Sequence, residues 1–396
     1  MSVEVELISD WPTLLTRRAA WADLLARSSS NEPTLSPLWL DTWWRIFADD
    51  QRALRAVLVY RRGRLIGLVP LLVHACRHRG WLPLRRLEFV GSGEAQSDEI
   101  YSEYINAIAE RGSEDQVVRA FVRALRDGVV GPWDELNLEM MDSLAPTTSA
   151  LIHELRRARL LEGVTPRAQC FYIPLPDTWD AYLASLSPSR RYFLRRTMRA
   201  INKWGGDQLT VTRAADPAQL SEGIEILIDL HGQRWRQEGN AGMFASKRFT
   251  QFHRTVMPAL LERGQLDLFW MSKAEQPLAA AYNIVWNDTI YFYQSGRYPK
   301  VPSKIRPGIA IHVHAIRHAI ACGRKKYDFM AGATRYKRQL SLAQTSLLSL
   351  RARNPRSLAG HARALVERGE GIARQVRQRL IDRHRADEPA DTPAST

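Results

Sequence analysis

Cysteine is scarce in this sequence. Three cysteines, Cys76, Cys170 and Cys322, lie far apart among the 396 residues. No CxxC pair and no Cys/His spacing of a zinc site accompanies them, and an odd number at such distances provides no disulfide framework. We therefore expect three small buried or half-buried side chains, and no metal site.

Long apolar runs are also missing. The longest one, LIGLVPLLVHAC, begins at Leu65. It is far shorter than the roughly 20 residues that a membrane-spanning helix requires. The first residues, MSVEVELISDW, are acidic and lack the apolar core that a signal peptide needs. Both features predict a cytoplasmic protein.

Several motifs of well-known enzyme classes do not occur. No GxGxxG follows an expected strand, and the sequence has no GxxxxGK[ST] loop, no HExxH pair and no GxSxG turn. These motifs hold phosphates, zinc or a serine nucleophile in the enzymes that use them. Nucleotide-hydrolysing, zinc-hydrolase and serine-hydrolase functions are therefore disfavoured.

Positive charge, in contrast, is in excess. Lysine and arginine number 56 against 42 aspartate and glutamate residues, which gives a formal net charge of +14. Such a balance favours an anionic partner, either a nucleic acid, a membrane surface or a phosphorylated cofactor. The 45% of apolar and 25% of charged residues are typical of a globular protein.

The order of the expected elements predicts an α+β fold of two tandem units, with mixed, largely antiparallel sheets flanked by helices. Residues 1–155 and 156–353 each follow a pattern of helices, strands, a helix and a further strand. Within the second unit, three consecutive strands between residues 266 and 297 are joined by tight turns and predict an antiparallel meander. Residues 354–396 are expected to form a basic helix and a disordered tail.

The segment LHGQRWRQEG places four side chains with chemical potential on one expected helix. His231 and Trp235 are four residues apart, and so are Arg234 and Glu238, so the two pairs lie on adjacent helix faces. Together they could hold a polar substrate and accept a proton. Alternatively, Arg234 and Glu238 form a surface ion pair and Trp235 fills a core position.

A basic loop follows the third strand of the meander. Arg297, Lys300, Lys304 and Arg306 lead into a helix that begins with Pro307 and Gly308. The free N–H groups and the positive dipole end of a helix start favour a phosphate group. The loop therefore predicts a pyrophosphate-binding site.

A second basic segment, SPSRRYFLRRTMRAINKWGG, contains no acidic residue. Arg191, Arg195 and Arg199 share one helix face, where like charges four residues apart destabilise an isolated helix. An anionic partner would offset this repulsion. The alternative is a solvated basic face that pairs with carboxylates elsewhere.

In their order, several segments resemble the CelD-like (cellulose-biosynthesis-associated) branch of the GNAT acyltransferase superfamily. That branch is similar to the FemAB peptidyltransferases in having two tandem GNAT-like units. The resemblance spans about residues 15–350 and rests on these segments: LHGQRWRQEGNAGMF, PLAAAYNIVW, IYFYQSGRYP, PGIAIHVHAIRHAIACG, YDFMAGATRYKRQL and, in the first unit, FVGSGEAQSDEIYSEYINAIAE.

This resemblance implies transfer of an acyl group from a thioester, usually of coenzyme A, to an amine or hydroxyl. Asp328 is then expected as the general base, with His231 as a further proton acceptor. Tyr336, whose pKa we expect neighbouring cations to lower, would be the acid. Five side chains are expected to bind the substrate: Arg234, Trp235, Glu238, Lys337 and Tyr293.

Structural alternatives exist for the two residues near the last strands. Asp328 could instead cap the turn at Gly332 or pair with Lys326, and Tyr336 could be a core tyrosine. The GNAT pattern Q/R-x-x-G-x-G/A is missing from QSGRYPKVPSKIRPG. Its absence leaves aminoacyl-tRNA and an acyl carrier protein as other donors.

The sequence thus predicts a cytoplasmic N-acyltransferase that uses acyl-CoA as co-substrate and has no permanently bound cofactor. Its acceptor would be an amine, either on an amino sugar or on a polysaccharide precursor, and only the second unit would be catalytic. One alternative is a Fem-like transferase that uses aminoacyl-tRNA. Another is a non-catalytic scaffold of a polysaccharide-synthesis complex whose basic C-terminal helix contacts an anionic membrane. The acceptor, the acyl length and the oligomeric state are not predicted.

Overall fold

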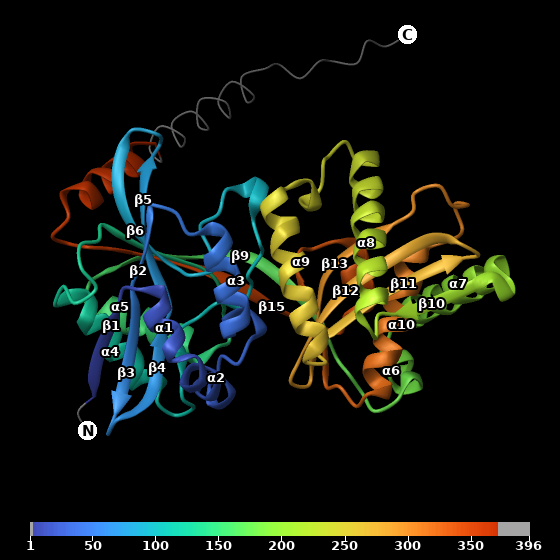
Figure 1. Cartoon of the computed structure of the whole chain (residues 1–396), viewed down its shortest axis with the longest axis horizontal. Helices are drawn as coiled ribbons and strands as arrows, with labels where there is room; N and C mark the ends of the chain where they lie inside the picture. The colour runs from blue at the N-terminus through green and yellow to red at the C-terminus, as the bar shows by residue number, and fades with distance from the viewer. Residues whose placement is uncertain (1–2, 371–396) are drawn as a thin grey trace, which may run out of the picture.

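The computed structural model describes residues 3–370, which form two groups of helices and strands side by side (Figure 1). The elements up to α5 are called the first half below, and those from β9 to β15 the second half. The first half contains β1 (Glu4–Ile8), α1 (Trp11–Thr16), α2 (Arg18–Arg27), α3 (Pro37–Phe47), β2 (Arg52–Leu54), β3 (Ala56–Arg61), β4 (Arg64–Val69), β5 (Leu71–His78), β6 (Leu82–Phe89), β7 (Ile108–Ala109), α4 (Glu114–Arg126), β8 (Glu135–Asp142) and α5 (Pro146–Arg157).

The second half has a similar number of elements. It contains β9 (Leu161–Pro174), α6 (Trp179–Ser185), α7 (Pro188–Gly205), β10 (Leu209–Arg213), α8 (Pro217–Gln237), α9 (Lys247–Glu262), β11 (Leu266–Lys273), β12 (Gln276–Trp286), β13 (Thr289–Arg297), α10 (Pro307–Ala321), β14 (Lys326–Ala331), α11 (Arg335–Leu340) and β15 (Ala343–Arg353).

One large sheet runs through both halves. Its strand order is β10-β11-β12-β13-β14-β9-β15-β8-β6-β5-β2, and a smaller sheet of the first half has the order β1-β3-β4-β7. The long strands β9 and β15 form an antiparallel ladder at the centre, and β15 also pairs with β8 of the first half. Helices flank these mixed sheets, as the predicted α+β class requires. The predicted division between residues 155 and 156 falls within the last turn of α5, before β9 begins, and it stays a prediction.

The predicted meander is present as β11, β12 and β13. Each strand pairs antiparallel with the next, and Asn287 in the turn between β12 and β13 has a φ of 51°. Asparagine tolerates this left-handed conformation better than most residues. A bulge beside Tyr293 interrupts the register between β12 and β13.

Strand β12 is apolar along its length because helices cover both faces of the sheet. Its side chains alternate between the faces. Ala280 and Tyr282 join the core beneath α8 and α9, whereas Ala279 and Ala281 join the core beneath α6, α7 and α10. Helices α8 and α9 accordingly lie over one face of the strands (Figure 1).

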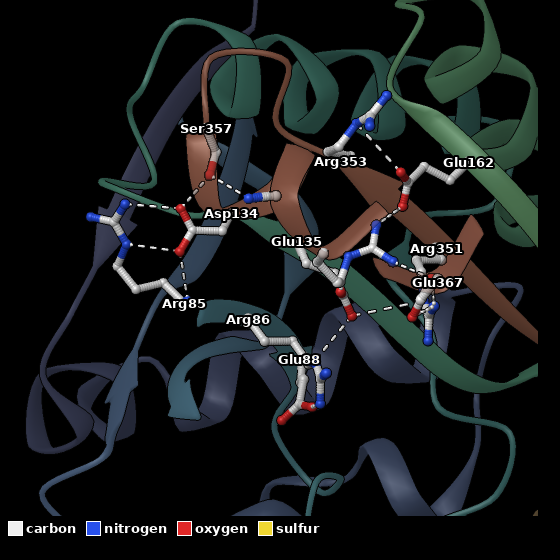
Figure 2. A network of polar contacts seen from close by, with 12 residues as sticks. Arg85, Arg86, Glu88, Asp134, Glu135, Glu162, Arg351, Arg353, Ser357 and Glu367 are labelled. Carbon is white, nitrogen blue, oxygen red and sulfur yellow. Dashed lines mark hydrogen bonds and ion pairs between the residues drawn. The ribbon is translucent and has the colours of Figure 1, made fainter. Parts of the chain in front are cut away.

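The segment after β15 returns to the first half. Residues 358–370 are helical, and the remainder of the predicted basic helix and tail lies outside the described residues. Arg363 of this helix is 1% exposed and forms ion pairs with Glu135 at 2.8 Å, with Glu367 at 2.7 Å and with Glu162. Figure 2 shows Glu135 within the same network, where Arg86 and Arg351 also approach it.

This network attaches the start of the C-terminal segment to the protein itself. The guanidinium of Arg363 is committed to three carboxylates, so it is not available to an anionic membrane surface. Within residues 3–370, none of the helices combines the length and the hydropathy that a membrane crossing requires.

Candidate functional site

The strands β13 and β14 separate towards their carboxyl ends. They are parallel neighbours only where Thr289–Tyr291 meets Lys326–Asp328. Beyond that point β13 continues along β12 to Arg297, whereas β14 pairs with β9. The sheet therefore opens beside the last residues of β13.

A pocket of about 500 Å³ lies at the end of β13. It is bounded by the loop that follows β13 and by parts of α8, α10 and α11. Three arginines line it, Arg234 from α8, Arg297 from β13 and Arg306 from the end of the loop. The predicted basic loop and the predicted Arg234 segment are thus brought together, although more than 60 residues separate Arg234 from Arg297.

The start of α10 adds a further positive element to this pocket. Pro307 and Gly308 begin this helix of 15 residues, and both line the pocket. The N-terminal end of a helix dipole favours negative charge. A Cβ added to Gly308 would lie 3.6 Å from the nearest side-chain atom, which belongs to Arg297. This is an ordinary van der Waals distance, so Gly308 and Arg297 are close neighbours in the pocket.

Two lysines of the loop differ from the prediction. Lys300 and Lys304 are exposed and do not line the pocket. The loop instead turns Val301 and Ile305 towards it, because these apolar side chains gain by burial while the lysines remain hydrated. Of the predicted phosphate-binding set, Arg297, Arg306 and Gly308 face the pocket.

Glu238 lies close to two of the pocket arginines. Its Oε1 atom is 3.4 Å from Arg234 and 3.6 Å from Arg297. The guanidinium of Arg234 also lies over the indole of Trp235, 5.0 Å from the ring centre. Of the predicted alternative, the Arg234–Glu238 ion pair is present, whereas Trp235 is half-buried and does not fill a core position.

Tyr336 of α11 lines the pocket, but its acidity differs from the prediction. Burial raises the pKa of its hydroxyl to about 12, and this outweighs the opposing effect of Arg234. The ring stacks on that of His312, with centroids 5.1 Å apart. The phenol is consequently protonated at neutral pH.

His312 was not predicted as a site residue, yet it lines the same pocket. Burial lowers its pKa to about 3, so the imidazole is neutral. It lies four residues after Gly308 on α10 and thus on the same helix face. That spacing from the helix start is the signal that would have identified it.

His231, predicted as a proton acceptor, has both ring nitrogens occupied. Its Nδ1 lies 3.1 Å from the carbonyl oxygen of Ser295, and its Nε2 lies 3.2 Å from the backbone nitrogen of Met243, which donates to it. It is 1% exposed, and burial lowers its pKa to about 4. His231 therefore joins α8 to β13 as a neutral side chain, which argues against the predicted catalytic role.

Asp328, the predicted base, is also fully occupied. It is 0% exposed, and its Oδ2 accepts from the Tyr104 hydroxyl at 2.9 Å and pairs with Lys326 at 2.8 Å. Its Oδ1 accepts from the Met330 N–H at 2.7 Å. The alternative in which Asp328 pairs with Lys326 is thus present, and Asp328 does not line the pocket.

Lys337 points away from the pocket into the boundary between the two halves. It is 7% exposed, and its ammonium donates to the backbone carbonyls of Met330 and Ala331. Burial lowers its pKa, while the nearby Glu103 carboxylate opposes that change. The predicted substrate-binding role is replaced by a contact that holds the turn before Tyr336.

Tyr293 likewise lies in the core rather than at the pocket. Its hydroxyl donates to the carbonyl of Ile100 in the first half and lies 3.1 Å from Nε2 of His253. Burial raises its pKa well above the ordinary value. The register shift at Tyr293 accompanies a side chain that packs in the core on the α9 face of the sheet.

A second groove, of about 750 Å³, lies between α6, α7 and α10. The predicted arginine face of α7 lines it, together with Arg317, whose guanidinium lies 4.7 Å from the ring centre of Trp179. The groove contains four arginines, Arg191, Arg195, Arg199 and Arg317. Within residues 3–370, none of the four forms an ion pair with a carboxylate.

Comparison with protein families identifies the second half. Residues 188–338 match the family model described as an acetyltransferase (GNAT) domain. This range contains every residue that lines the pocket at the end of β13. No curated protein sequence matches the chain.

Solved structures resemble the whole chain. The crystal structure of FemX superimposes with a TM-score of 0.57 at 12% identity, covering 87% of this chain and 96% of that chain. A conserved protein of unknown function from Bacteroides thetaiotaomicron gives a TM-score of 0.53 at 10% identity, covering 89% and 100%. The C-terminal domain of a candidate lysylphosphatidylglycerol synthetase from Agrobacterium fabrum gives 0.51 at 10% identity, covering 88% and 95%.

At such low identities these likenesses concern the fold alone. They extend over both halves, and they confirm the predicted α+β architecture. Residues 188–338 therefore carry a GNAT acetyltransferase domain, which indicates an acyltransferase, and the fold around it is similar to that of FemX.

Proposed function

We propose that the protein transfers an acyl group, in the simplest case acetyl, from acyl-CoA to an amine acceptor. The phosphates of the donor would lie in the pocket at the end of β13. The observation that carries this proposal is the convergence of Arg234, Arg297 and Arg306 on the N-terminal end of α10. Among the described residues no carboxylate lines the pocket.

The charge and geometry of this pocket suit a phosphorylated co-substrate. Guanidinium groups bind phosphate oxygens through two parallel hydrogen bonds, and they remain charged at every physiological pH. The helix start contributes the positive end of its dipole. A donor held in this way arrives and leaves in each cycle, so no permanently bound cofactor is needed.

In the reaction, the amine nitrogen attacks the thioester carbonyl carbon. A carbon–nitrogen bond forms, the carbon–sulfur bond breaks, and the proton that the amine loses balances the thiolate that departs. Tyr336 is suited to donate a hydrogen bond to that sulfur, because its pKa of about 12 keeps the hydroxyl protonated. Full proton transfer from it would be uphill, since a free thiol has a pKa of about 8.5.

The stacked ring of His312 would hold the Tyr336 hydroxyl in place. The centroid distance of 5.1 Å and the small interplanar angle of 23° define one orientation of the phenol. We assign the general base to none of the described residues, since Asp328 and His231 are occupied by other partners. The resemblance to the CelD-like branch supports an amino sugar or a polysaccharide precursor as the acceptor.

The proposal is tested by titration calorimetry with acetyl-CoA and with a longer acyl-CoA. Wild-type protein is expected to bind in the micromolar range, and an Arg297→Ala/Arg306→Ala variant to lose at least tenfold in affinity. A Lys300→Ala/Lys304→Ala variant removes the same charge from exposed positions and serves as the control. Absence of binding to wild type at every acyl length would reject acyl-CoA as the donor.

A second candidate function is transfer from aminoacyl-tRNA. The arginine groove along α7 favours it, since Arg195 and Arg199 have no carboxylate partner within residues 3–370. Binding of tRNA should then weaken steeply with salt, because each phosphate contact releases a counterion. Thermal stabilisation by tRNA but not by acetyl-CoA would favour this donor, and stabilisation by anionic vesicles alone would favour a scaffold.

A further inference from the structure

We propose that Glu238, which lies beside the donor pocket without lining it, acts as an internal anion that competes with the donor phosphates for Arg234 and Arg297. A donor phosphate must then displace it before Arg234 and Arg297 can bind that phosphate. This inference rests on the proposed function, because it concerns the same pocket. It makes Glu238 a residue that determines donor affinity, in place of the substrate-binding role predicted from the sequence.

The shared contact of one oxygen atom carries the inference. Oε1 of Glu238 lies 3.4 Å from Arg234 and 3.6 Å from Arg297, two arginines on different elements. Within residues 3–370 neither arginine pairs with any other carboxylate. The carboxylate thus contacts the same two guanidiniums that a phosphate oxygen in the pocket would contact.

Glu238 is placed where it can leave this position at little cost. It is the residue that follows the last turn of α8, and Gly239 next to it has a φ of 74°. Its side chain is 41% exposed, and that of Arg297 is 42% exposed. Exposed ion pairs of this kind are weak, so hydration of the released carboxylate offsets most of the loss.

The third arginine of the pocket differs from the two that contact Glu238. Arg306, the third arginine of the pocket, lies over the ring of Phe193 at 5.4 Å and has no carboxylate partner in the described part of the chain. Within the described residues Arg306 therefore has no carboxylate partner, whereas Arg234 and Arg297 share Glu238. An incoming phosphate would first meet Arg306 and would then exchange with Glu238.

The test is a titration of CoA and, separately, of inorganic pyrophosphate into wild type and into Glu238→Gln. The substitution keeps the shape and removes the charge, so both probes are expected to bind about three- to tenfold more tightly. Glu225→Gln is the matched control, since Glu225 lies on the same helix and pairs with Arg254 at 2.6 Å outside the pocket. That control should leave both affinities unchanged.

Each result separates this inference from the proposed function. Unchanged or weaker binding of both probes by Glu238→Gln, with normal binding by wild type, would overturn the inference and leave the acyl-CoA proposal intact. Tighter pyrophosphate binding by the variant without any CoA binding would support the inference and reject acyl-CoA. Absence of binding of either probe to every variant would overturn both. Equal melting temperatures of the variants would confirm that folding is unaffected.

A double variant isolates the mechanism. In an Arg297→Ala background the Glu238→Gln substitution should improve pyrophosphate binding by less than it does in wild type, because one of the two covered guanidiniums is gone. An equal improvement in both backgrounds would show that Glu238 acts through long-range repulsion rather than by covering Arg297, and would overturn the displacement described above.

Discussion

The carboxylate of Glu103 accepts a hydrogen bond from the backbone N–H of Ala331 at 2.7 Å, across 228 positions of sequence. Glu103 belongs to the first half, and Ala331 ends β14 in the second. On the other side of this strand end, Lys337 donates to the carbonyl of Ala331. The first half therefore helps to hold the turn that leads to Tyr336 at the pocket.

The burial of Glu103 predicts a pH-dependent contribution to stability. Burial, its largest cause, raises the Glu103 pKa from 4.5 to about 7 in the folded protein. A carboxyl group with a raised pKa in the folded protein favours folding in its protonated form. The stability that it adds is fully present below about pH 4.5 and is lost as the pH rises through about 7. Over this range the unfolding free energy falls by up to about 1.4 kcal/mol per pH unit. Glu103→Gln should therefore lower the difference in unfolding free energy between pH 5 and pH 7.5, measured by urea denaturation.

Glu32 and Glu94 titrate in the same direction, because burial raises their pKa values to about 7 and about 8. Wild-type stability should therefore still fall with rising pH after the Glu103 substitution, but less steeply. A difference between pH 5 and pH 7.5 as large in Glu103→Gln as in wild type would contradict this assignment.

The buried Arg363 network predicts a large loss of stability. Arg363→Ala removes three ion pairs and leaves Glu135, which is 0% exposed, with only Arg86 and the more distant Arg351. Breaking a buried pair on one side costs about 3–5 kcal/mol. Arg368→Ala, an exposed arginine on the same helix, should change the unfolding free energy by less than about 0.5 kcal/mol. A similar effect of both variants would show that the network adds little.

The close approach of α8 to β13 predicts that Gly296 cannot be replaced. A Cβ at this position would lie 2.4 Å from the backbone nitrogen of His231, which cannot move away as a flexible side chain could. Gly296→Ala should destabilise the protein by at least about 1–3 kcal/mol in denaturant unfolding. Gly163→Ala has nothing within 4 Å of the added Cβ and should be tolerated, within about 1 kcal/mol.

Removal of the Tyr336 hydroxyl should affect the reaction rather than donor binding. Tyr336→Phe keeps the ring against His312 and deletes the group proposed to donate to the leaving thiolate. We expect kcat to decrease by about 100-fold, which is the low end of the rate contribution of a proton-donating side chain. The Kd for CoA should not change. The rate is followed as free thiol released from acetyl-CoA with amino sugars or polyamines as acceptors.

The pH profile of that reaction checks the same assignment. Since the Tyr336 pKa is about 12, wild type should lose no activity through its deprotonation between pH 6 and pH 10. A kcat of Tyr336→Phe equal to that of wild type would exclude the hydroxyl from the reaction. Loss of CoA binding in this variant would instead indicate a role in holding the donor.

Local patterns were read correctly from the sequence because their causes lie within a few residues. A serine followed by a proline is typical of a helix start, and the Ser36 hydroxyl does accept from the N–H of Trp39 at 3.2 Å where a helix begins at Pro37. The meander, the helix after the basic loop and the α+β class follow in the same way from periodicity and turn residues. The convergence of Arg297 and Arg306 was also predictable, since one short loop carries both.

The roles of the buried polar residues were decided by tertiary structure. Asp328, His231 and Tyr293 stand out in the sequence as chemical groups, yet each is bonded to a partner that the fold brings from a distance. Lys337 is instead bonded to backbone carbonyls six and seven residues before it. Buried polar groups must find such partners, because leaving them unpaired costs more than a hydrogen bond returns. The sequence by itself therefore determined which elements form and where cations gather, whereas only the tertiary packing decided which side chains face the pocket and which are bonded elsewhere.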